Sequence, residues 1–224
     1  MGFSEEFFSK KVRNSKLFKA ALTHRSAGGE NNERLEYLGD AVLGLIIAEY
    51  LFDNYPDLDE GVLSRMRSHL DRKEMLASLA KKNKLGDEIV LGHGELKSGG
   101  HNRDSILADC LEAVIGTCYL EIGLKGTKKF VMKLYENELK NLPNVNELKD
   151  PKTRLQELLQ SVNTSLPEYQ LVEEKSDAHK RLFVVQCVVK QYEICKTGQG
   201  PTKRKAEQAS AEKVFKKLVS TLSP

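Results

Sequence analysis

The sequence predicts an all-α domain followed by a small α+β domain in the order helix, three strands, helix. Apolar residues recur at helical spacing through about the first 140 positions. Pro and Asn punctuate the stretch 141–151, and alternating apolar residues follow it. We therefore expect a first domain at residues 1–145, a linker at 146–151 and a second domain at 152–221.

The first domain is expected to consist almost wholly of helices. The segment 55–61 predicts a turn before an acidic helix start, and the Gly-rich segment 92–101 predicts a polar loop. The helices are expected at residues 4–11, 15–22, 32–53, 60–67, 71–82, 102–122 and 125–140.

The second domain changes period from helix to strand and back again. A helix is expected at 152–162 and another at 202–219, each with an apolar stripe on one side. Three strands are expected between them, at 168–174, 180–189 and 192–197. A three-stranded antiparallel sheet with both helices on one face would bury both stripes.

Charge is distributed unevenly along the 224 residues, although the net charge is only +3. From Asp150 to the end there are 13 Lys and Arg against 9 Asp and Glu, whereas the preceding part holds 22 and 23. The basic surplus lies in the C-terminal third, which fits a polyanionic partner.

The cysteine pattern and the apolar runs indicate a cytoplasmic protein. The four cysteines form no C-x-x-C pair and have apolar neighbours, so we interpret them as reduced thiols rather than disulfides or zinc ligands. The N-terminus lacks a signal-peptide pattern. The apolar runs are too short and too interrupted by charge for a membrane span.

Two apolar segments each place acidic residues on one helical face. Glu33, Glu36 and Asp40 fall at i, i+3 and i+7. Asp109 and Glu112 lie three residues apart, with no basic partner at helical spacing. Burying like charges together is costly unless something positive lies between them. The stripes therefore predict one site around a hard divalent cation, Mg²⁺ or Mn²⁺ rather than zinc.

A surface ion pair is the ordinary role of a single acidic residue, and Glu33 is open to it because Arg25 and Arg34 are near in sequence. Glu60 follows Asp59 at a helix start, where a carboxylate can simply stabilise the helix N-terminus.

A basic run opens the last helix, directly after a Gly-Gln-Gly segment. It consists of Lys203, Arg204 and Lys205. Backbone N–H groups and the helix dipole also favour phosphate at such a place. The run therefore predicts phosphate contacts, with a merely solvated face as the alternative.

Three segments resemble the motifs of the bacterial ribonuclease III family, in the family's order. They are Asn32–Asp40, Asp59–Arg67 and Ser98–Gly116. The tail, including Gly198–Ala209, resembles the family's double-stranded-RNA-binding domain. The resemblance covers nearly the whole chain and implies an endoribonuclease that hydrolyses phosphodiesters in double-stranded RNA.

The family's acidic positions all carry acidic residues in this chain: Glu33, Glu36, Asp40, Glu60, Asp109 and Glu112. The resemblance implies that Mg²⁺, with Mn²⁺ able to substitute, is held by Glu36, Asp40, Asp109 and Glu112. It implies catalytic positions at Asp40, Glu112, Glu33 and Glu60, and no organic cofactor. In-line attack by water would leave 5′-phosphate and 3′-hydroxyl ends with short 3′ overhangs.

The tail of the family binds RNA, and the resemblance assigns contacts there. Thr153, Gln156 and Glu157 match minor-groove contacts, and His179 matches a second one in the loop between the first two strands. The family is homodimeric, so that paired sites cut both strands. Ribosomal RNA precursors and structured transcripts are the substrates that the resemblance implies.

Two alternatives stay open at this point. The chain could be a non-catalytic double-stranded-RNA-binding protein with a vestigial acidic site, although the complete acidic set argues against that. It could also be a metal-dependent hydrolase of another phosphate substrate with the tail as an adaptor, which a comparison of RNA and DNA duplexes would reveal.

Overall fold

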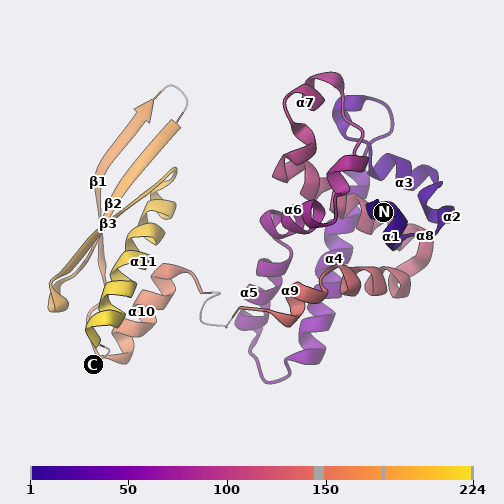
Figure 1. The fold of residues 1–224 in the computed structure, drawn as a ribbon. Helices are drawn as coiled ribbons and strands as arrows, with labels where there is room; N and C mark the ends of the chain where they lie inside the picture. Colours follow the sequence, from indigo (N-terminus) through magenta and orange to yellow (C-terminus); the bar gives the residue numbers. More distant parts are fainter. Residues whose placement is uncertain (1, 144–148, 178–179, 223–224) are drawn as a thin grey trace. The chain divides into compact units, whose positions relative to one another are not determined.

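The chain forms two compact units, with the boundary after Pro143 (Figure 1). The computed structural model describes residues 2–143, 149–177 and 180–222. The expected fold class is confirmed, since helices build the first unit and a helix–sheet–helix arrangement builds the second. Among the described residues, none of the helices is long and apolar enough to cross a membrane.

The first unit is built from α-helices and short 3-10 turns, with one parallel bridge between Thr23 and Val90. Its α-helices are α1 (Phe3–Phe7), α2 (Lys10–Arg13), α3 (Lys16–Ala21), α4 (Glu33–Asn54), α5 (Glu60–Leu70), α6 (Lys73–Lys82), α7 (His93–Lys97), α8 (Asp104–Leu134) and α9 (Glu136–Lys140). The turns are η1 (Arg25–Ala27), η2 (Leu85–Glu88) and η3 (Gly100–Asn102).

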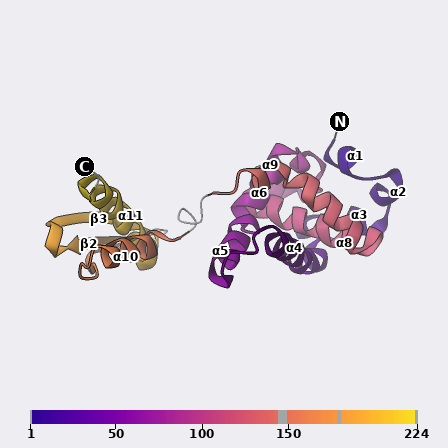
Figure 2. The same cartoon turned by 90° about the horizontal axis from the view of Figure 1, so that it is seen from below.

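The long helices α4 and α8 pack against each other at the centre of this unit (Figures 1 and 2). Both bury apolar side chains along their contact, including Leu43 and Ile47 on α4 and Leu111 and Ile115 on α8. Helix α6 covers another side of α8. The apolar stripes of the sequence therefore form this core, and the two acidic stripes lie on the helices that build it.

Several expected helix boundaries in the first unit were wrong. The helix expected at 4–11 is divided into α1 and α2, because Phe8 is extended and the Ser9 hydroxyl accepts a hydrogen bond from Val12 N–H as an N-cap. The expected loop at 92–101 contains α7 and η3. The helix expected at 125–140 is divided at Tyr135 between the end of α8 and α9. The break expected between 102–122 and 125–140 is confirmed, because Gly123 interrupts α8 with non-helical torsions (φ 69°, ψ 173°), a conformation open to glycine, and the chain bends there.

The second unit contains α10 (Pro151–Ser161), β1 (Glu168–Asp177), β2 (Lys180–Val189), η4 (Lys190–Tyr192), β3 (Ile194–Gly200) and α11 (Lys203–Leu222). The strands form an antiparallel sheet in the order β1-β2-β3. The first and third strands extend past their expected ends at 174 and 197.

Both helices of the second unit share one core with the sheet, as the apolar stripes predicted. The buried residues of this core are Leu155, Leu159, Cys187, Val189, Ile194, Ala211, Val214 and Leu218. Gly198 permits close packing, because a Cβ there would lie 2.1 Å from the backbone nitrogen of Ser210 on α11. The N-terminal half of α11 is thereby packed closely against β3.

Candidate functional site

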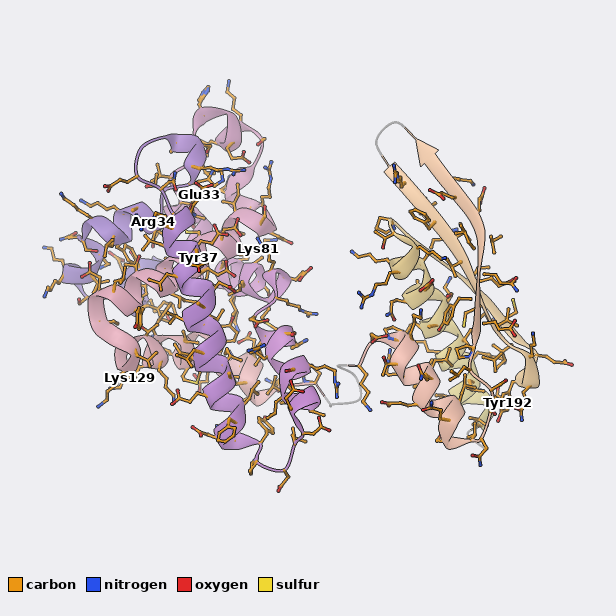
Figure 3. All side chains as sticks on the ribbon, turned by 180° about the vertical axis from the view of Figure 1, so that it is seen from behind. Glu33, Arg34, Tyr37, Lys81, Lys129 and Tyr192 are labelled. Atoms are coloured by element: carbon orange, nitrogen blue, oxygen red, sulfur yellow. The ribbon has the colours of Figure 1, made fainter. Side chains whose placement is uncertain are left out.

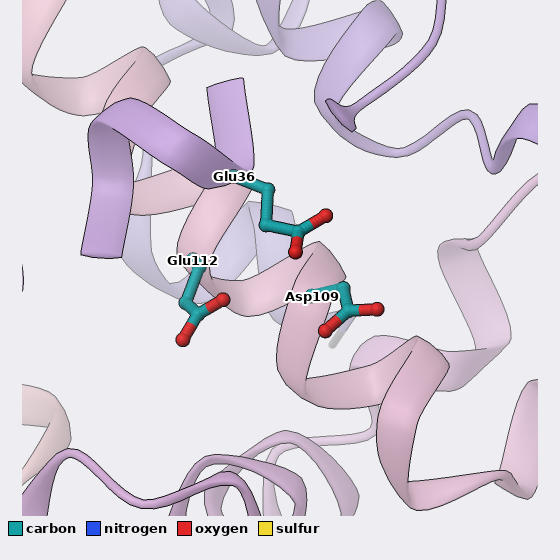
Figure 4. A group of neighbouring side chains, drawn as sticks. All are labelled: Glu36, Asp109 and Glu112. Carbon is teal, nitrogen blue, oxygen red and sulfur yellow. The ribbon is translucent and has the colours of Figure 1, made fainter. Parts of the chain in front are cut away.

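Three carboxylates from α4 and α8 converge in the first unit (Figure 4). Ligand oxygens of Glu36, Asp109 and Glu112 all lie within 4.8 Å of one another. Glu36 comes from α4, and the other two come from α8. The acidic stripes of α4 and α8 therefore come together, as expected, through these three residues.

Two glycines bring the backbones of α4 and α8 close enough for this meeting. A Cβ on Gly39 would lie 1.7 Å from the carbonyl oxygen of Glu112, and a Cβ on Gly116 would lie 2.3 Å from that of Leu35. No other residue fits at either position without separating the helices. Glu36 lies one turn before Gly39, so this close approach aims its carboxylate toward α8.

Burial and the repulsion between neighbouring carboxylates raise the pKa of two members of the cluster, Glu112 and Glu36. Glu112 is only 6% exposed, and burial together with the negative charges of Asp40, Glu36 and Asp109 raises its pKa to about 8. Burial and the charge of Asp109 also raise the pKa of Glu36. A cation placed among these oxygens would therefore relieve a repulsion that the fold itself creates.

Lys73, the first residue of α6, places a positive charge beside the carboxylate cluster. Its Nζ donates a hydrogen bond of 2.7 Å to Asp109 Oδ1, while its side chain stays 61% exposed. This bond, and the nearby charges of Glu112 and Glu36, raise the pKa of Lys73. The sequence showed no basic partner at helical spacing from Asp109. The partner comes from another helix, 36 residues earlier in the chain.

Asp40 lies on the same helix as Glu36 but outside this cluster of three, with an exposed side chain. Its charge still contributes to the raised pKa of Glu112 and of Asp71, the residue after α5. Burial is the main cause of the Asp71 shift, partly offset by Arg67. Asp71 is a further acidic group beside the site, and no sequence pattern connected it with the two stripes.

Glu33 and Glu60 lie apart from the three clustered carboxylates. Glu33 is exposed at the first position of α4 (Figure 3), with one oxygen 3.3 Å from Arg25 Nη1. Glu60 is exposed at the first position of α5 and accepts a hydrogen bond from Ser64 Oγ. The ordinary roles considered from the sequence are therefore both present: Glu33 pairs with Arg25 at the surface, and Glu60 lies at a helix start.

The donor set at the cluster suits a hard divalent cation. Three carboxylates offer oxygen ligands alone, and Mg²⁺, Mn²⁺ and Ca²⁺ prefer such ligands, whereas zinc prefers His and Cys. The raised pKa of Glu112 adds a second physical reason, because a neighbouring cation favours the ionised form of a buried carboxyl.

In the second unit, the first two turns of α10 and of α11 border an open hollow of about 600 Å³, here called the α10–α11 hollow. Its lining combines residues from both helices that the sequence singled out. The lining residues are Asp150, Lys152, Thr153, Gln156, Lys203, Arg204, Glu207 and Gln208.

The other expected RNA contacts lie outside this hollow. Lys205 is exposed at the start of α11, where its backbone N–H donates to Thr202 Oγ1. Glu157 is exposed on α10 and lies 2.6 Å from Lys149 Nζ. His179 lies outside the described residues.

Family comparisons agree with both units. Residues 14–139 match the family model described as ribonuclease-III-like, and residues 151–218 match the double-stranded RNA binding motif. The first match includes the acidic cluster, and the second includes every lining residue of the α10–α11 hollow except Asp150.

Relatives from bacteria match over most of their length. Ribonuclease 3 of Pasteurella multocida is 52% identical over 202 residues, 90% of either chain. Ribonuclease 3 of Photobacterium profundum is 48% identical over 207 residues, 92% of either chain. The solved nuclease domain of ribonuclease III from Campylobacter jejuni is 40% identical with a TM-score of 0.57, covering 63% of this chain and 97% of that one. The chain therefore belongs to the ribonuclease III family: it is an endoribonuclease whose C-terminal unit carries a double-stranded RNA binding motif.

Proposed function

We propose that this enzyme hydrolyses phosphodiesters in double-stranded RNA with Mg²⁺, leaving 5′-phosphate and 3′-hydroxyl ends with short 3′ overhangs. The observation that carries the proposal is the convergence of Glu36, Asp109 and Glu112 within 4.8 Å. Mn²⁺ offers the same preference for oxygen ligands and should substitute.

In this proposal the cluster and Asp40 hold the cation, and Glu33 and Glu60 lie beside the scissile phosphate. Mg²⁺ bound there supplies positive charge that offsets the phosphate and stabilises the leaving oxygen. Glu112, buried and held by α8, keeps the ligand oxygens in place. Lys73 adds a fixed positive charge at Asp109 and reduces the repulsion that RNA would otherwise meet.

RNA recognition is proposed for the second unit. Thr153, Gln156, Glu157 and His179 would contact the minor groove, where ribose hydroxyls are accessible. Lys203, Arg204 and Lys205 would contact phosphates at the helix start, where backbone N–H groups add to their charge. The α10–α11 hollow, in which Thr153 and Gln156 face the start of α11, supports this arrangement.

A homodimer would place two such sites on one duplex, one for each strand. Helix α4 exposes a row of large apolar side chains that fits this role. Tyr37, Leu45 and Phe52 are 83%, 55% and 73% exposed and share one helical face, with Tyr37 labelled in Figure 3. The related Campylobacter jejuni structure is described as showing flexibility in a region involved in dimer formation. Tyr37→Glu combined with Phe52→Glu should yield monomers in light scattering.

We also propose that the enzyme acts in the cytoplasm on ribosomal RNA precursors and structured transcripts. These are long RNAs with duplex segments, which the proposed binding mode recognises by shape rather than by sequence.

The direct test incubates the purified protein with a perfect RNA duplex, with Mg²⁺ and without it, and maps both ends of the products. Single-stranded RNA and a DNA duplex of the same sequence serve as controls. Cleavage of the RNA duplex alone, only with Mg²⁺, is expected. Binding without cleavage would make the protein a binding module, and equal cleavage of DNA would make it a less selective phosphate hydrolase.

A further inference from the structure

Gln208 on α11 uses both ends of its side-chain amide to hold the start of α10. Its Oε1 accepts a hydrogen bond from the backbone N–H of Lys152 at 3.0 Å. Its Nε2 donates to Asp150 Oδ1 at 2.8 Å. One partner is a donor and the other an acceptor, so only this orientation of the amide satisfies both.

The contact completes the N-terminal cap of α10. Pro151 has no N–H, and the Asp150 carboxylate accepts from the backbone N–H and hydroxyl of Thr153 at 3.1 and 2.8 Å. The Lys152 N–H lies in the first turn, where no carbonyl of its own helix is in reach, and it donates to Gln208 across the interface between the helices. The cap of one helix is thus built partly from the other.

The network continues to a side chain that the proposed function assigns to RNA. The Thr153 hydroxyl donates its proton in a hydrogen bond to Asp150, so its oxygen remains available as an acceptor. A ribose 2′-hydroxyl can donate to such an acceptor. Burial would raise the pKa of Asp150, but hydrogen bonds from Gln208 and Thr153 outweigh it and hold that pKa below its usual range. Asp150 therefore remains an ionised acceptor that orients Thr153.

Duplex RNA makes the spacing of these helices matter. Its minor groove and the neighbouring phosphates are separated by a distance that the rigid A-form helix sets. Contacts on α10 and on the start of α11 can form together only when the two helices already have the matching separation. A preset separation lowers the cost of binding, because no ordering has to occur on the RNA.

We propose that Gln208 is a positioning residue for duplex RNA, which sets the separation between Thr153 and Gln156 on α10 and Lys203 and Arg204 on α11. The proposal rests on the RNA contacts proposed above for these two helices. The role proposed for Gln208 is exerted through Asp150 and the first turn of α10 rather than through a contact of its own with RNA.

The test uses the full chain and Gln208→Leu, which keeps the side chain's size and removes both hydrogen bonds. Duplex RNA affinity should fall about 5- to 20-fold, as expected for two hydrogen bonds of ordinary strength. In cleavage with Mg²⁺, KM should rise by a similar factor, and kcat should stay unchanged because the acidic cluster lies in the other unit.

The matched control is Glu212→Gln, which breaks an ion pair between α10 and α11 away from the hollow. Glu212 pairs with Arg154 and does not line the hollow. It should lower thermal stability about as much as Gln208→Leu while leaving RNA affinity unchanged. Equal losses of affinity in the two variants would reduce Gln208 to a merely structural role and overturn the proposal.

Gln208→Glu gives a second, independent readout. The carboxylate keeps an oxygen that can accept from the Lys152 N–H but has no proton to donate to Asp150 Oδ1, so RNA binding should weaken. Parent affinity, with the variant folded by circular dichroism, would contradict the proposed bridge.

Lys203→Glu with Arg204→Glu, measured in parallel, separates this proposal from the one on which it rests. Loss of affinity in that pair together with parent affinity in Gln208→Leu would remove only the positioning role. Parent affinity in both would remove the RNA surface itself and the positioning role with it.

Discussion

Gly39 on α4 lies so close to Glu112 on α8 that a Cβ on Gly39 would be 1.7 Å from the Glu112 carbonyl oxygen. That oxygen belongs to backbone in the middle of a long buried helix and cannot turn aside. The same helix contact brings Glu36 within reach of Asp109 and Glu112. The close packing of α4 against α8 and the acidic cluster therefore both depend on the absence of a Cβ at Gly39.

Gly39→Ala should cost about 2–3 kcal/mol of stability, because the added methyl group forces the helices apart. It should also weaken Mg²⁺ binding, since the carboxylates separate with the helices. Gly44→Ala on the same helix is the control, because its Cβ would meet nothing within 4 Å. That control should be neutral or stabilising by up to about 1 kcal/mol. Urea unfolding measures both, and equal effects would refute the close-contact argument.

Glu112→Gln should abolish cleavage while leaving RNA binding nearly intact. The substitution keeps the size of the side chain but removes one of the three clustered carboxyl groups that can bind a cation. Turnover should fall at least about 100-fold, because the cation contributes several kcal/mol of charge stabilisation. Asp40→Asn should behave in the same direction. Cleavage at the parent rate in Mg²⁺ would show that Glu112 is no metal ligand.

The stability of the metal-free protein should fall as pH rises from about 4.5 to about 8. The pKa of Glu112 is raised to about 8 in the folded state, so the folded chain keeps a proton that the unfolded chain has already released. The stabilisation is complete below the unfolded pKa and is lost through the folded one, by an amount on the order of a few kcal/mol. Glu112→Gln should flatten this decline in urea unfolding with EDTA. Parallel pH profiles for the two proteins would contradict it.

Lys73→Met should tighten binding of Mg²⁺ or Mn²⁺ by about 3- to 10-fold, as expected when a partly screened positive charge leaves the site. It also frees Asp109 Oδ1 from its hydrogen bond. Calorimetric titration measures the affinity. Lys81→Met is the control, because Lys81 pairs with Asp104 instead. Weaker cation binding in Lys73→Met would show that the lysine helps to build the site.

Reversing the charge of Lys203, Arg204 and Lys205 should weaken duplex RNA binding and reduce its dependence on salt. The slope of log affinity against log salt should drop by about one for each phosphate that the protein no longer neutralises. Lys217→Glu, exposed near the other end of α11, should leave the slope almost unchanged. A constant slope in the triple variant would exclude the start of α11 from the interface.

The sequence by itself determined the fold class and which helices carry acidic residues. Apolar periodicity is local, so it predicted the core stripes of α4, α8, α10 and α11. It failed where a single residue interrupts an expected helix, as at Phe8 and at Tyr135, although it did predict the break at Gly123. Those outcomes depend on local torsions that hydrophobic period does not record.

Only the tertiary structure decided which carboxylates come together and which basic side chain lies beside them to offset their charge. It brings together Glu36, Asp109 and Glu112, leaves Asp40 at the edge, and adds Lys73 from α6. It also joins Gln208 to the start of α10, 58 residues away in the chain from Asp150. The physical reason is that spacing along a chain relates residues of one helix, whereas contacts between helices depend on how closely their backbones pack.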